Sequence, residues 1–472
     1  EFLAISSASN QFITSLSTRR FDMKVVHNLH RYFPESCGGI QIHLEELIPY
    51  LKAKDISGSV LAAIDGKQAQ SYLHKGVQVY RYPTFPDPPK QPNHGAFKHG
   101  NFNLFYARLA KERPDIYHQH QWTPRCGLEH LKAAKKLGIK TVVTLHLPET
   151  ICLRGTMMFE GQVACDGKIS TVRCSRCVDA YSRGLPNTVI SALGKLPEDI
   201  INRLSLPAST YATHPVYSKA AQFIRPTIIP GYTNAQLRSL HQLATYADCI
   251  VVVADWLKRA LLKNDILESK IKTCKCGIEV PSNNKILNRT LNADSDTLKI
   301  AFLGRWNQTK GVHILVDALD LIPSEINLKL HIHGIQQDEK YQHEITQRAK
   351  DNNRIEIASQ VFRHKLRPTL AQYDALAVPS QWLETGPLVV PEAHSVGIPV
   401  VGSNLGGIAE RVRHNVDGLL VKAHDPKAWA RAFTRLGSDS SLLAKLRQGI
   451  GPVRTIEQEA EDLAQIYRGL CS

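Results

Sequence analysis

The sequence contains no long hydrophobic run, since none of its apolar stretches approaches the roughly 18 residues that a membrane-spanning helix requires. It also contains no low-complexity segment and no short repeat. No predicted strand is followed by a G-x-G-x-x-G motif with a later acidic residue, which argues against a dehydrogenase. Aromatic and basic residues are not interleaved as they are in nucleic-acid-binding modules. What is present is an ordinary globular composition over 472 residues, a length that predicts two or three domains.

The chain is basic, with a formal net charge of +15 at pH 7. Its Lys and Arg residues are scattered rather than gathered in blocks. Such a balance indicates anionic partners, which could be nucleotides, phosphates, anionic lipid surfaces or nucleic acid. The first 22 residues begin with Glu1 rather than methionine and are rich in serine and threonine. We expect them to be a flexible leader; a signal peptide is the alternative, but the segment lacks a basic start and an apolar core.

Short apolar runs alternate with longer amphipathic stretches along the whole chain. In the first half, these runs predict strands over residues 24–27, 58–63, 77–81, 115–119, 140–145 and 249–253. The polar stretch 279–296 then predicts a linker, after which strands are expected over residues 298–303, 328–333, 354–358, 374–378 and 398–402. Alternating strands and helices predict an α/β chain of two doubly wound, parallel-sheet domains. We place these domains at 23–285 and 297–452, with a closing helix in 453–472.

Two carboxylates bracket the stretch around which the second domain is organised. Glu384 and Glu392 are separated by seven residues, and Gly386, Pro387 and Leu388 lie between them. Glycine lets a backbone approach a ligand closely, and proline suits the first position of a helix. A helix beginning near Pro387 would offer free N–H groups and a positive dipole end to an anion. The stretch therefore predicts an anion site flanked by two carboxylates.

Two further loops carry groups suited to phosphate. In the second domain, Arg305 follows the strand at 298–303, and Lys310 comes five residues later. A guanidinium and an ammonium that flank one loop suit a diphosphate. In the first domain, Gly39 lies in a Gly-Gly pair at the start of a predicted helix, where backbone N–H groups could meet a phosphate.

Histidines and cysteines mark the first domain. His118, His120 and His146 follow predicted strands, so they are expected at one edge of the sheet, where ligands of open parallel sheets bind. Four cysteines cluster with the spacing C-x12-C-x8-C-x2-C, namely Cys152, Cys165, Cys174 and Cys177. This pattern fits a tetrahedral zinc site within a cysteine-rich insert over residues 150–186. Two disulfides, four free thiols or an iron–sulfur cluster are the alternatives.

The stretch from Glu384 to Glu410 resembles the donor-site signature of the retaining family-4 glycosyltransferases, which have the GT-B fold of two Rossmann-like domains. The G-R…K-G loop and the Gly-Gly helix start are also similar to that family. The resemblance implies that Arg305 and Lys310 bind the nucleotide diphosphate, that Glu392 binds ribose, and that Glu384 contacts the transferred sugar. It further implies a role for His146 in the sugar pocket. His43 matches a histidine of the family's N-terminal helix and would lie, with His118 and His120, on the acceptor side.

The resemblance implies a retaining glycosyltransferase that moves a sugar from a nucleotide-diphosphate sugar to a glycan, lipid-linked or small-molecule acceptor. No catalytic metal is expected, because two cations would stabilise the leaving diphosphate; the zinc would be structural. We expect a cytoplasmic enzyme that could make peripheral contact with an anionic membrane, and no nucleic-acid partner. The alternatives are another GT-B enzyme, such as a nucleotide-sugar epimerase or a phosphorylase-like enzyme, and a zinc-containing nucleic-acid-binding protein.

Overall fold

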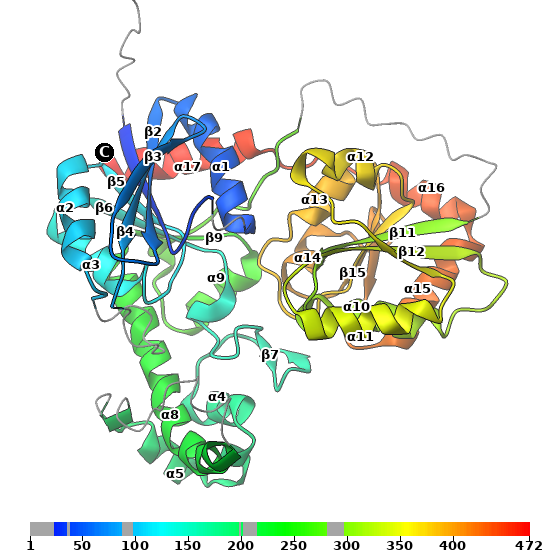
Figure 1. Ribbon diagram of the computed structural model, residues 1–472, viewed down its shortest axis with the longest axis horizontal. Helices are drawn as coiled ribbons and strands as arrows, with labels where there is room; N and C mark the ends of the chain where they lie inside the picture. The colour runs from blue at the N-terminus through cyan, green and yellow to red at the C-terminus, as the bar shows by residue number, and fades with distance from the viewer. Residues whose placement is uncertain (1–22, 35–37, 87–97, 198–199, 202–214, 281–296) are drawn as a thin grey trace, which may run out of the picture.

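A computed structural model of the chain describes residues 23–34, 38–86, 98–197, 200–201, 215–280 and 297–472. The predicted leader and most of the predicted linker lie outside these residues. The described chain forms two α/β halves that stand side by side in Figure 1. Each half is built on its own largely parallel sheet, which confirms the fold class predicted from the alternating pattern.

The sheet of the first half has eight strands in the order β10-β9-β6-β5-β1-β2-β4-β3. Their bounds are β1 (Met23–Leu29), β2 (Ile56–Ile64), β3 (Gln70–His74), β4 (Val77–Pro83), β5 (Ile116–Gln119), β6 (Lys140–Leu145), β9 (Cys249–Val252) and β10 (Ile271–Thr273). All neighbouring strands are parallel except β3, which pairs antiparallel with β4. The chain order reverses between β1 and β5, and such switch points are where open α/β sheets bind ligands.

Helices cover both faces of this sheet, and an insert extends from one end of it in Figure 1. The covering helices include α1 (Gly39–Lys52), α2 (Phe102–Glu112), α3 (Leu128–Lys136) and α9 (Asp255–Lys263). The insert contains η1 (Pro148–Thr150), β7 (Met158–Phe159), β8 (Val163–Ala164), α4 (Thr171–Val178), η2 (Tyr181–Gly184) and α5 (Asn187–Leu193). The long helix α8 (Pro215–Tyr246) packs against α4 and α5 and returns the chain to β9.

The sheet of the second half has six parallel strands in the order β13-β12-β11-β14-β15-β16. They are β11 (Leu298–Arg305), β12 (Leu328–Ile335), β13 (Ile355–Ala358), β14 (Ala375–Val378), β15 (Val400–Ser403) and β16 (Gly418–Val421). The helices are η4 (Gln308–Lys310), α10 (Val312–Leu319), α11 (Glu339–Lys350), η5 (Arg363–Lys365), α12 (Leu366–Leu370), α13 (Val389–His394), α14 (Gly406–Arg411), α15 (Pro426–Ser438) and α16 (Ser440–Gln448). Here the switch point lies between β11 and β14, the two strands that precede the predicted donor loops.

The last helix, α17 (Ile456–Cys471), returns to the first half and packs against α1 (Figure 1). It begins with a capping box, in which the side chains of Thr455 and Gln458 each accept from the other's backbone N–H. Its buried face, which includes Ile456, Leu463 and Tyr467, joins the hydrophobic cluster under β1 and α1. Burial of this apolar face fixes the helix to the first sheet.

The predicted strands all exist, with ends that differ by at most two residues. Strands β3, β7, β8, β10 and β16 were not predicted. Of these, β3 has an exposed or half-exposed side chain at every position and so lacks an apolar signal. Among the described residues, no helix combines the length and the apolar composition needed to cross a membrane.

Candidate functional site

The loop that follows β14 connects the two halves of the molecule. Trp382 and Leu383 are buried, and both pack into the hydrophobic cluster of the first half rather than that of their own. The backbone N–H of Leu383 donates to the carbonyl of Thr156 at 3.1 Å. The hydroxyl of Thr385 donates to the carbonyl of His146 at 2.5 Å. This loop therefore places Glu384 against the end of β6, where the sequence predicted His146 to lie.

The carboxylate of Glu384 is held on one side only. Its Oε1 atom accepts from the Lys310 ammonium at 2.5 Å, from the Ser380 hydroxyl at 2.8 Å and from the Trp382 indole N–H at 2.9 Å. Within the described chain, no hydrogen bond reaches Oε2, and this atom is not among the buried unpartnered atoms. Glu384 is buried, so three donors fix the carboxylate while one oxygen remains available to a ligand.

The two cations of the predicted diphosphate loop differ in environment. Arg305, at the end of β11, is exposed, and its guanidinium makes no hydrogen bond or ion pair within the described chain. Lys310 is instead paired with Glu384, and its ammonium lies 5.7 Å from the centre of the Trp382 ring. Arg305 is thus free to meet an anion, whereas Lys310 already serves to orient the carboxylate.

Glu392 lies on α13 and is 5% exposed. Its Oε1 atom accepts from the guanidinium of Arg363, which also forms two hydrogen bonds, at 2.8 and 3.0 Å, with the carboxylate of Glu46 on α1. Burial raises the pKa of Glu392, and the charge of Arg363 opposes that rise. Arg363 therefore links the two halves next to the carboxylate that was predicted to bind ribose.

The backbone groups predicted to meet the anion lie in both halves of the molecule. α1 begins at Gly39, which is exposed, and its first turn has neither a side-chain cap nor an acidic residue. Among the described residues, none would lie within 4 Å of a β-carbon at Gly39. Between the two glutamates, Gly386 and Leu388 are half-buried and Pro387 is buried. The helix assigned here, α13, begins two residues after Pro387, although a turn already closes from Pro387 to Val390 at 3.3 Å.

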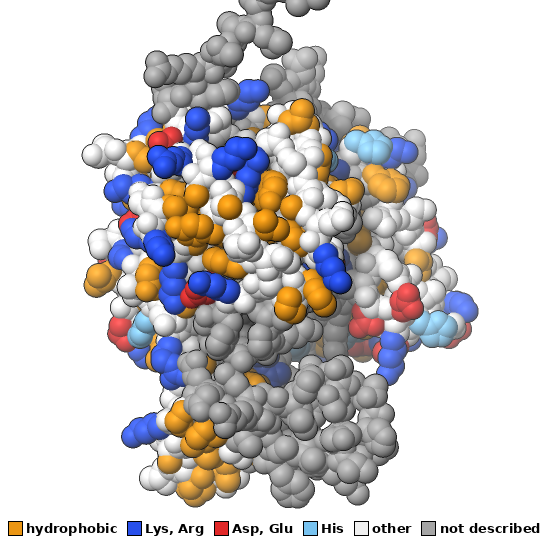
Figure 2. Space-filling view, turned by 60° about the vertical axis from the view of Figure 1, so that its left-hand side comes forward, with side chains coloured by type: hydrophobic (Ala, Val, Ile, Leu, Met, Phe, Trp, Pro, Cys, Tyr) orange, Lys and Arg blue, Asp and Glu red, His pale blue; other side chains and the backbone are white. Residues whose placement is uncertain are grey.

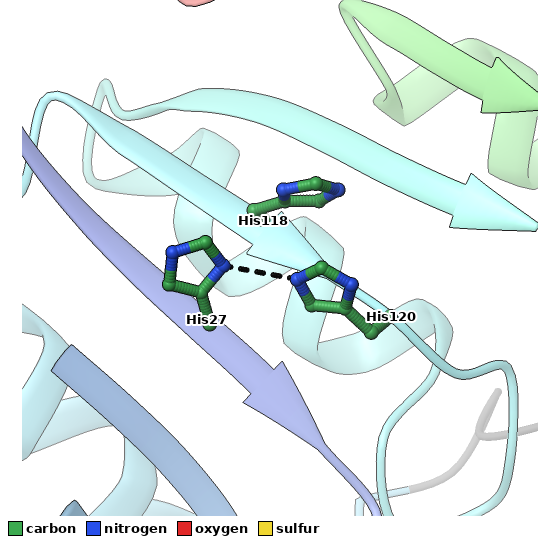
Figure 3. A group of neighbouring side chains, drawn as sticks. All are labelled: His27, His118 and His120. Atoms are coloured by element: carbon green, nitrogen blue, oxygen red, sulfur yellow. Dashed lines mark hydrogen bonds between the residues drawn. The ribbon is translucent and has the colours of Figure 1, made fainter. Parts of the chain in front are cut away.

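Three of the predicted histidines lie at the carboxyl ends of β5 and β6. The Nδ1 atom of His120 lies 3.3 Å from the Nε2 atom of His146, and His120 Nε2 lies 3.0 Å from Nδ1 of His27 on β1. His118 is fully buried beside them and bonds the hydroxyls of Thr144 and Tyr467 instead. Figure 3 shows His27, His118 and His120 gathered at the ends of β1 and β5. The sequence prediction missed His27, whose place near the end of the first strand was the available signal.

His43 was predicted to lie on the acceptor side, but the structure places it in the interior. It is 5% exposed, and its Nε2 atom forms an ion pair with Glu459 of α17 at 2.8 Å. Burial alone would lower the pKa of His43, but the charge of Glu459 and the neighbouring Cys276 raise it well above the usual value. His118, likewise predicted for the acceptor side, bonds hydroxyls within the core. All three histidines line a small cavity together with His146, and His120 also lines a second pocket with His146 and Trp122.

The four clustered cysteines line one cavity in the insert, and all four are free thiols. Three of the sulfurs are near N–H donors: Cys165 accepts from Arg173, Cys174 from the backbone of Ser170, and Cys177 from the backbone of Glu160. Burial raises the pKa of Cys174 to about 11, with the neighbouring thiols adding to the rise. Burial also raises the pKa of Cys152, against backbone N–H groups that lower it. No three of these sulfurs lie within 4.8 Å of one another, so the thiols share a cavity without forming a compact ligand set.

Two other groups in the described chain bring three metal-ligating atoms within 4.8 Å of one another. They are His27 with His118 and His120, and His43 with Cys276 and Glu459. Both groups are buried, and most of their ligand atoms already bond protein partners. Their arrangement is that of interior hydrogen-bonded networks rather than of open coordination sites.

Two family models match the chain. The model described as Glycosyltransferase Family 4 matches residues 37–162, and the model described as Glycosyl transferases group 1 matches residues 283–450. The D-inositol 3-phosphate glycosyltransferase of Pseudarthrobacter chlorophenolicus is 31% identical over 414 residues, which cover 85% of this chain and 82% of that protein. The chain therefore belongs to the family-4 glycosyltransferases. A second D-inositol 3-phosphate glycosyltransferase, from Xylanimonas cellulosilytica, is 32% identical over 34% of this chain, and the match spans 39% of that protein.

Solved structures confirm the fold of this glycosyltransferase. The crystal structure of Anabaena HepE in complex with UDP and glucose matches 95% of this chain and 100% of that one, with a TM-score of 0.57 and 16% sequence identity. The two parallel-sheet α/β halves have the GT-B architecture.

Several residues at the site of this glycosyltransferase had no local signal in the sequence. The carboxylate of Glu410 accepts from the backbone N–H groups of Asp255 and Trp256, so it caps α9 of the opposite half at 2.8 and 2.7 Å. The indole N–H of Trp256 donates to the carbonyl of Glu384 at 2.9 Å. Arg363 links Glu46 and Glu392 in the same way. Each of these links joins residues of different halves, which a local motif cannot reveal.

Proposed function

We propose that this glycosyltransferase transfers a sugar from a nucleotide-diphosphate sugar with retention of the anomeric configuration, to a glycan, lipid-linked or small-molecule acceptor. The observation that carries the proposal is the Glu384 carboxylate, which is fixed by three donors at Oε1 and free at Oε2 beside the end of β6. A fixed, desolvated acceptor of this kind suits a sugar hydroxyl. The similar HepE structure is a complex with UDP and glucose, which supports a nucleotide-sugar donor here.

The donor would lie over the switch point between β11 and β14. Arg305, which has no partner within the described chain, would bind the diphosphate together with the backbone N–H groups of Gly39, Gly386 and Leu388. Lys310 would stabilise the same charge from its place beside Glu384. Glu392 retains an oxygen without a protein donor and would accept from the ribose hydroxyls, as the family resemblance implies.

The acceptor would enter on the side of the first half. A pocket next to His146 is lined by His120, Trp122, Thr123 and Thr150, among other residues. Its walls mix an indole, hydroxyls and imidazoles, which suits a polyhydroxylated acceptor. The departing diphosphate would take the acceptor proton on the face from which it leaves, so no protein nucleophile is needed for retention.

We also infer a structural zinc ion held by Cys152, Cys165, Cys174 and Cys177. Four thiols that line one cavity, three of which accept from N–H donors, match the ligand types of a closed zinc site. The metal would draw the sulfurs inward, since zinc–sulfur bonds are about 2.3 Å long. Elemental analysis of the purified protein should find about one zinc per chain, lost in each Cys→Ser variant. A metal-free protein whose four thiols titrate freely would overturn the assignment.

The face that bears α2 and α3 would be the one that meets an anionic membrane. Figure 2 brings this side of the molecule forward and shows blue Lys and Arg side chains around orange apolar ones, with few acidic side chains between them. Exposed cations on and next to these helices include Lys111, Arg113, Lys135 and Lys136. Co-sedimentation with vesicles that contain anionic lipid, and not with neutral vesicles, is expected. Equal binding to both, or none, would remove this contact from the proposal.

A thermal-shift screen with UDP-, GDP- and ADP-sugars tests the donor class, because a ligand that binds only the folded state raises the melting temperature. We expect one nucleotide series to raise it, and Arg305→Ala to abolish the shift. Once the donor is known, NMR of the product tests retention through the configuration at the anomeric carbon. An inverted product would overturn the mechanism, and donor breakdown or epimerisation without an acceptor would favour another GT-B activity.

A further inference from the structure

A chain of three imidazoles runs from the transfer site into the core of the first half. His146 is half-buried at the end of β6, His120 is 3% exposed, and His27 is fully buried on β1. Their ring nitrogens meet in order: His146 Nε2 with His120 Nδ1 at 3.3 Å, and His120 Nε2 with His27 Nδ1 at 3.0 Å. The second of these contacts is the dashed line in Figure 3. Four of the six ring nitrogens therefore contact another imidazole, and the two that do not are Nδ1 of His146 and Nε2 of His27.

All three rings are neutral at physiological pH. Burial lowers the pKa of His27 to about 3 and that of His120 well below its usual value. Burial, with the charge of His43 as a smaller contribution, lowers the pKa of His146 to about 3. A neutral imidazole carries one N–H and one bare nitrogen. Each ring in the chain must therefore donate in one direction and accept from the other, so the three tautomers are set together.

His27, at the buried end of the row of three imidazoles, decides in which direction the hydrogen bonds are donated. The Nε2 atom of His27 is buried and has no hydrogen-bond partner. If this atom carried the proton, a buried N–H would be left without an acceptor, which is the rarer defect in folded proteins and is costly. The proton therefore lies on Nδ1 of His27, which donates to Nε2 of His120. His120 then donates from Nδ1 to Nε2 of His146.

We propose that His27 and His120 are positioning residues that hold His146 in its Nδ1-protonated form. His146 then presents an N–H donor to the transfer site from the one nitrogen that makes no hydrogen bond within the described chain. As a donor, it binds an oxygen of the transferred sugar and cannot act as the base that takes the acceptor proton. This inference rests on the proposed function for the part of it that concerns the sugar, but not for the tautomer itself.

Nitrogen-15 NMR of the full-length, histidine-labelled protein measures the tautomer directly, because protonated and bare ring nitrogens have different shifts and couplings. The resonances of His146 are assigned by their loss in His146→Gln. We expect His146 to be protonated at Nδ1 and bare at Nε2. The opposite tautomer, or a mixture of both, would overturn the proposal, and neither result depends on finding the substrates.

Variants of His120 test the consequence for transfer. In His120→Leu the chain is broken, so we expect a mixed tautomer at His146 and a fall in kcat of about tenfold or more, with little change in donor KM. His120→Gln should restore much of kcat, because one amide offers both the acceptor and the donor that the chain needs. His118→Gln is the matched control. The ring of His118 lies 4.0 Å from that of His120 and is equally buried, but it bonds the hydroxyls of Thr144 and Tyr467 and not one of the three imidazoles.

The outcomes separate the two proposals. If the wild type binds no nucleotide sugar and transfers nothing, the proposed function fails, while the NMR result still decides the tautomer. If transfer occurs but His120→Leu and His118→Gln lower kcat equally, His120 has only a structural role, and the proposal that it positions His146 is wrong. If His120→Leu does not fold, the wild-type spectrum alone remains decisive.

Discussion

The ion pair between Lys310 and Glu384 predicts that substitutions of two cations in one loop, Lys310 and Arg305, have different effects. Lys310 is 21% exposed at its side chain and Glu384 is 8% exposed, so their contact is largely shielded from water. Arg305 is exposed and unpaired within the described chain. Lys310→Ala should therefore lower both the stability of the free protein and its affinity for nucleotide diphosphate, whereas Arg305→Ala should lower only the affinity.

The expected size follows from the contacts. Lys310 supplies one charge-assisted hydrogen bond, at 2.5 Å, to a carboxylate oxygen that keeps two neutral donors when it is removed. Such a bond contributes about 1.5–3 kcal/mol. A loss of about 2 kcal/mol would lower the melting temperature of a domain of this size by about 4–8 °C. Arg305→Ala should change it by about 1–2 °C at most, as surface substitutions usually do.

A double-mutant cycle isolates the pair. Lys310→Ala, Glu384→Gln and the double variant are each unfolded in urea, and the coupling free energy is the departure from additivity. We expect a coupling of about 2 kcal/mol, with nucleotide affinity measured in parallel by calorimetry. If the two substitutions are additive, the ion pair does not hold the carboxylate. If Arg305→Ala leaves the affinity for UDP and GDP unchanged, the loop does not bind the diphosphate.

Other contacts give three further predictions. Glu46→Gln should weaken the link to Arg363 and give a more open particle in small-angle scattering without nucleotide; Glu45→Gln, its neighbour paired within the first half, is the control, and equal profiles for both would contradict the link. The free energy of unfolding should fall by about 2 kcal/mol between neutral pH and pH 5 through His27 alone, because the unfolded state binds more protons between pH 6.5 and 3; a His27→Gln variant with the same loss would contradict it. Gly311→Ala should destabilise the second half by several kcal/mol, roughly 2 or more, because φ is +77° and the β-carbon would lie 1.9 Å from a main-chain carbonyl; a melting temperature within a degree of wild type would refute this.

The fold was predictable because parallel strands are buried on both faces and so appear as short apolar runs. The runs at 298–303 and 328–333 became β11 and β12 for that reason. Where a strand lies at an edge and is exposed, as in β3, no such run exists. Site residues on loops after strands were likewise predictable, because the carboxyl ends of parallel strands share one edge.

The rest of the site depends on contacts between distant residues. Arg363 and Glu46 are 317 positions apart, and His43 and Glu459 are 416 apart. No local pattern indicates which of many arginines or glutamates will meet. The same limit explains why Lys310 was predicted as a free phosphate ligand: its pairing with Glu384, 74 positions away, appears only when β11 and β14 lie side by side.

The return of α17 has a practical consequence for dissecting the molecule. The first half is discontinuous in sequence, because its last helix comes after the whole of the second half. A fragment that ends before Ile456 would expose the hydrophobic cluster against which Leu463 and Tyr467 pack, so it should aggregate. The second half, in contrast, is one continuous stretch of the sequence from β11 to α16. It is inserted into the first half, but expressed alone it would expose Trp382 and Leu383, which pack into the hydrophobic cluster of the first half, so it too should aggregate.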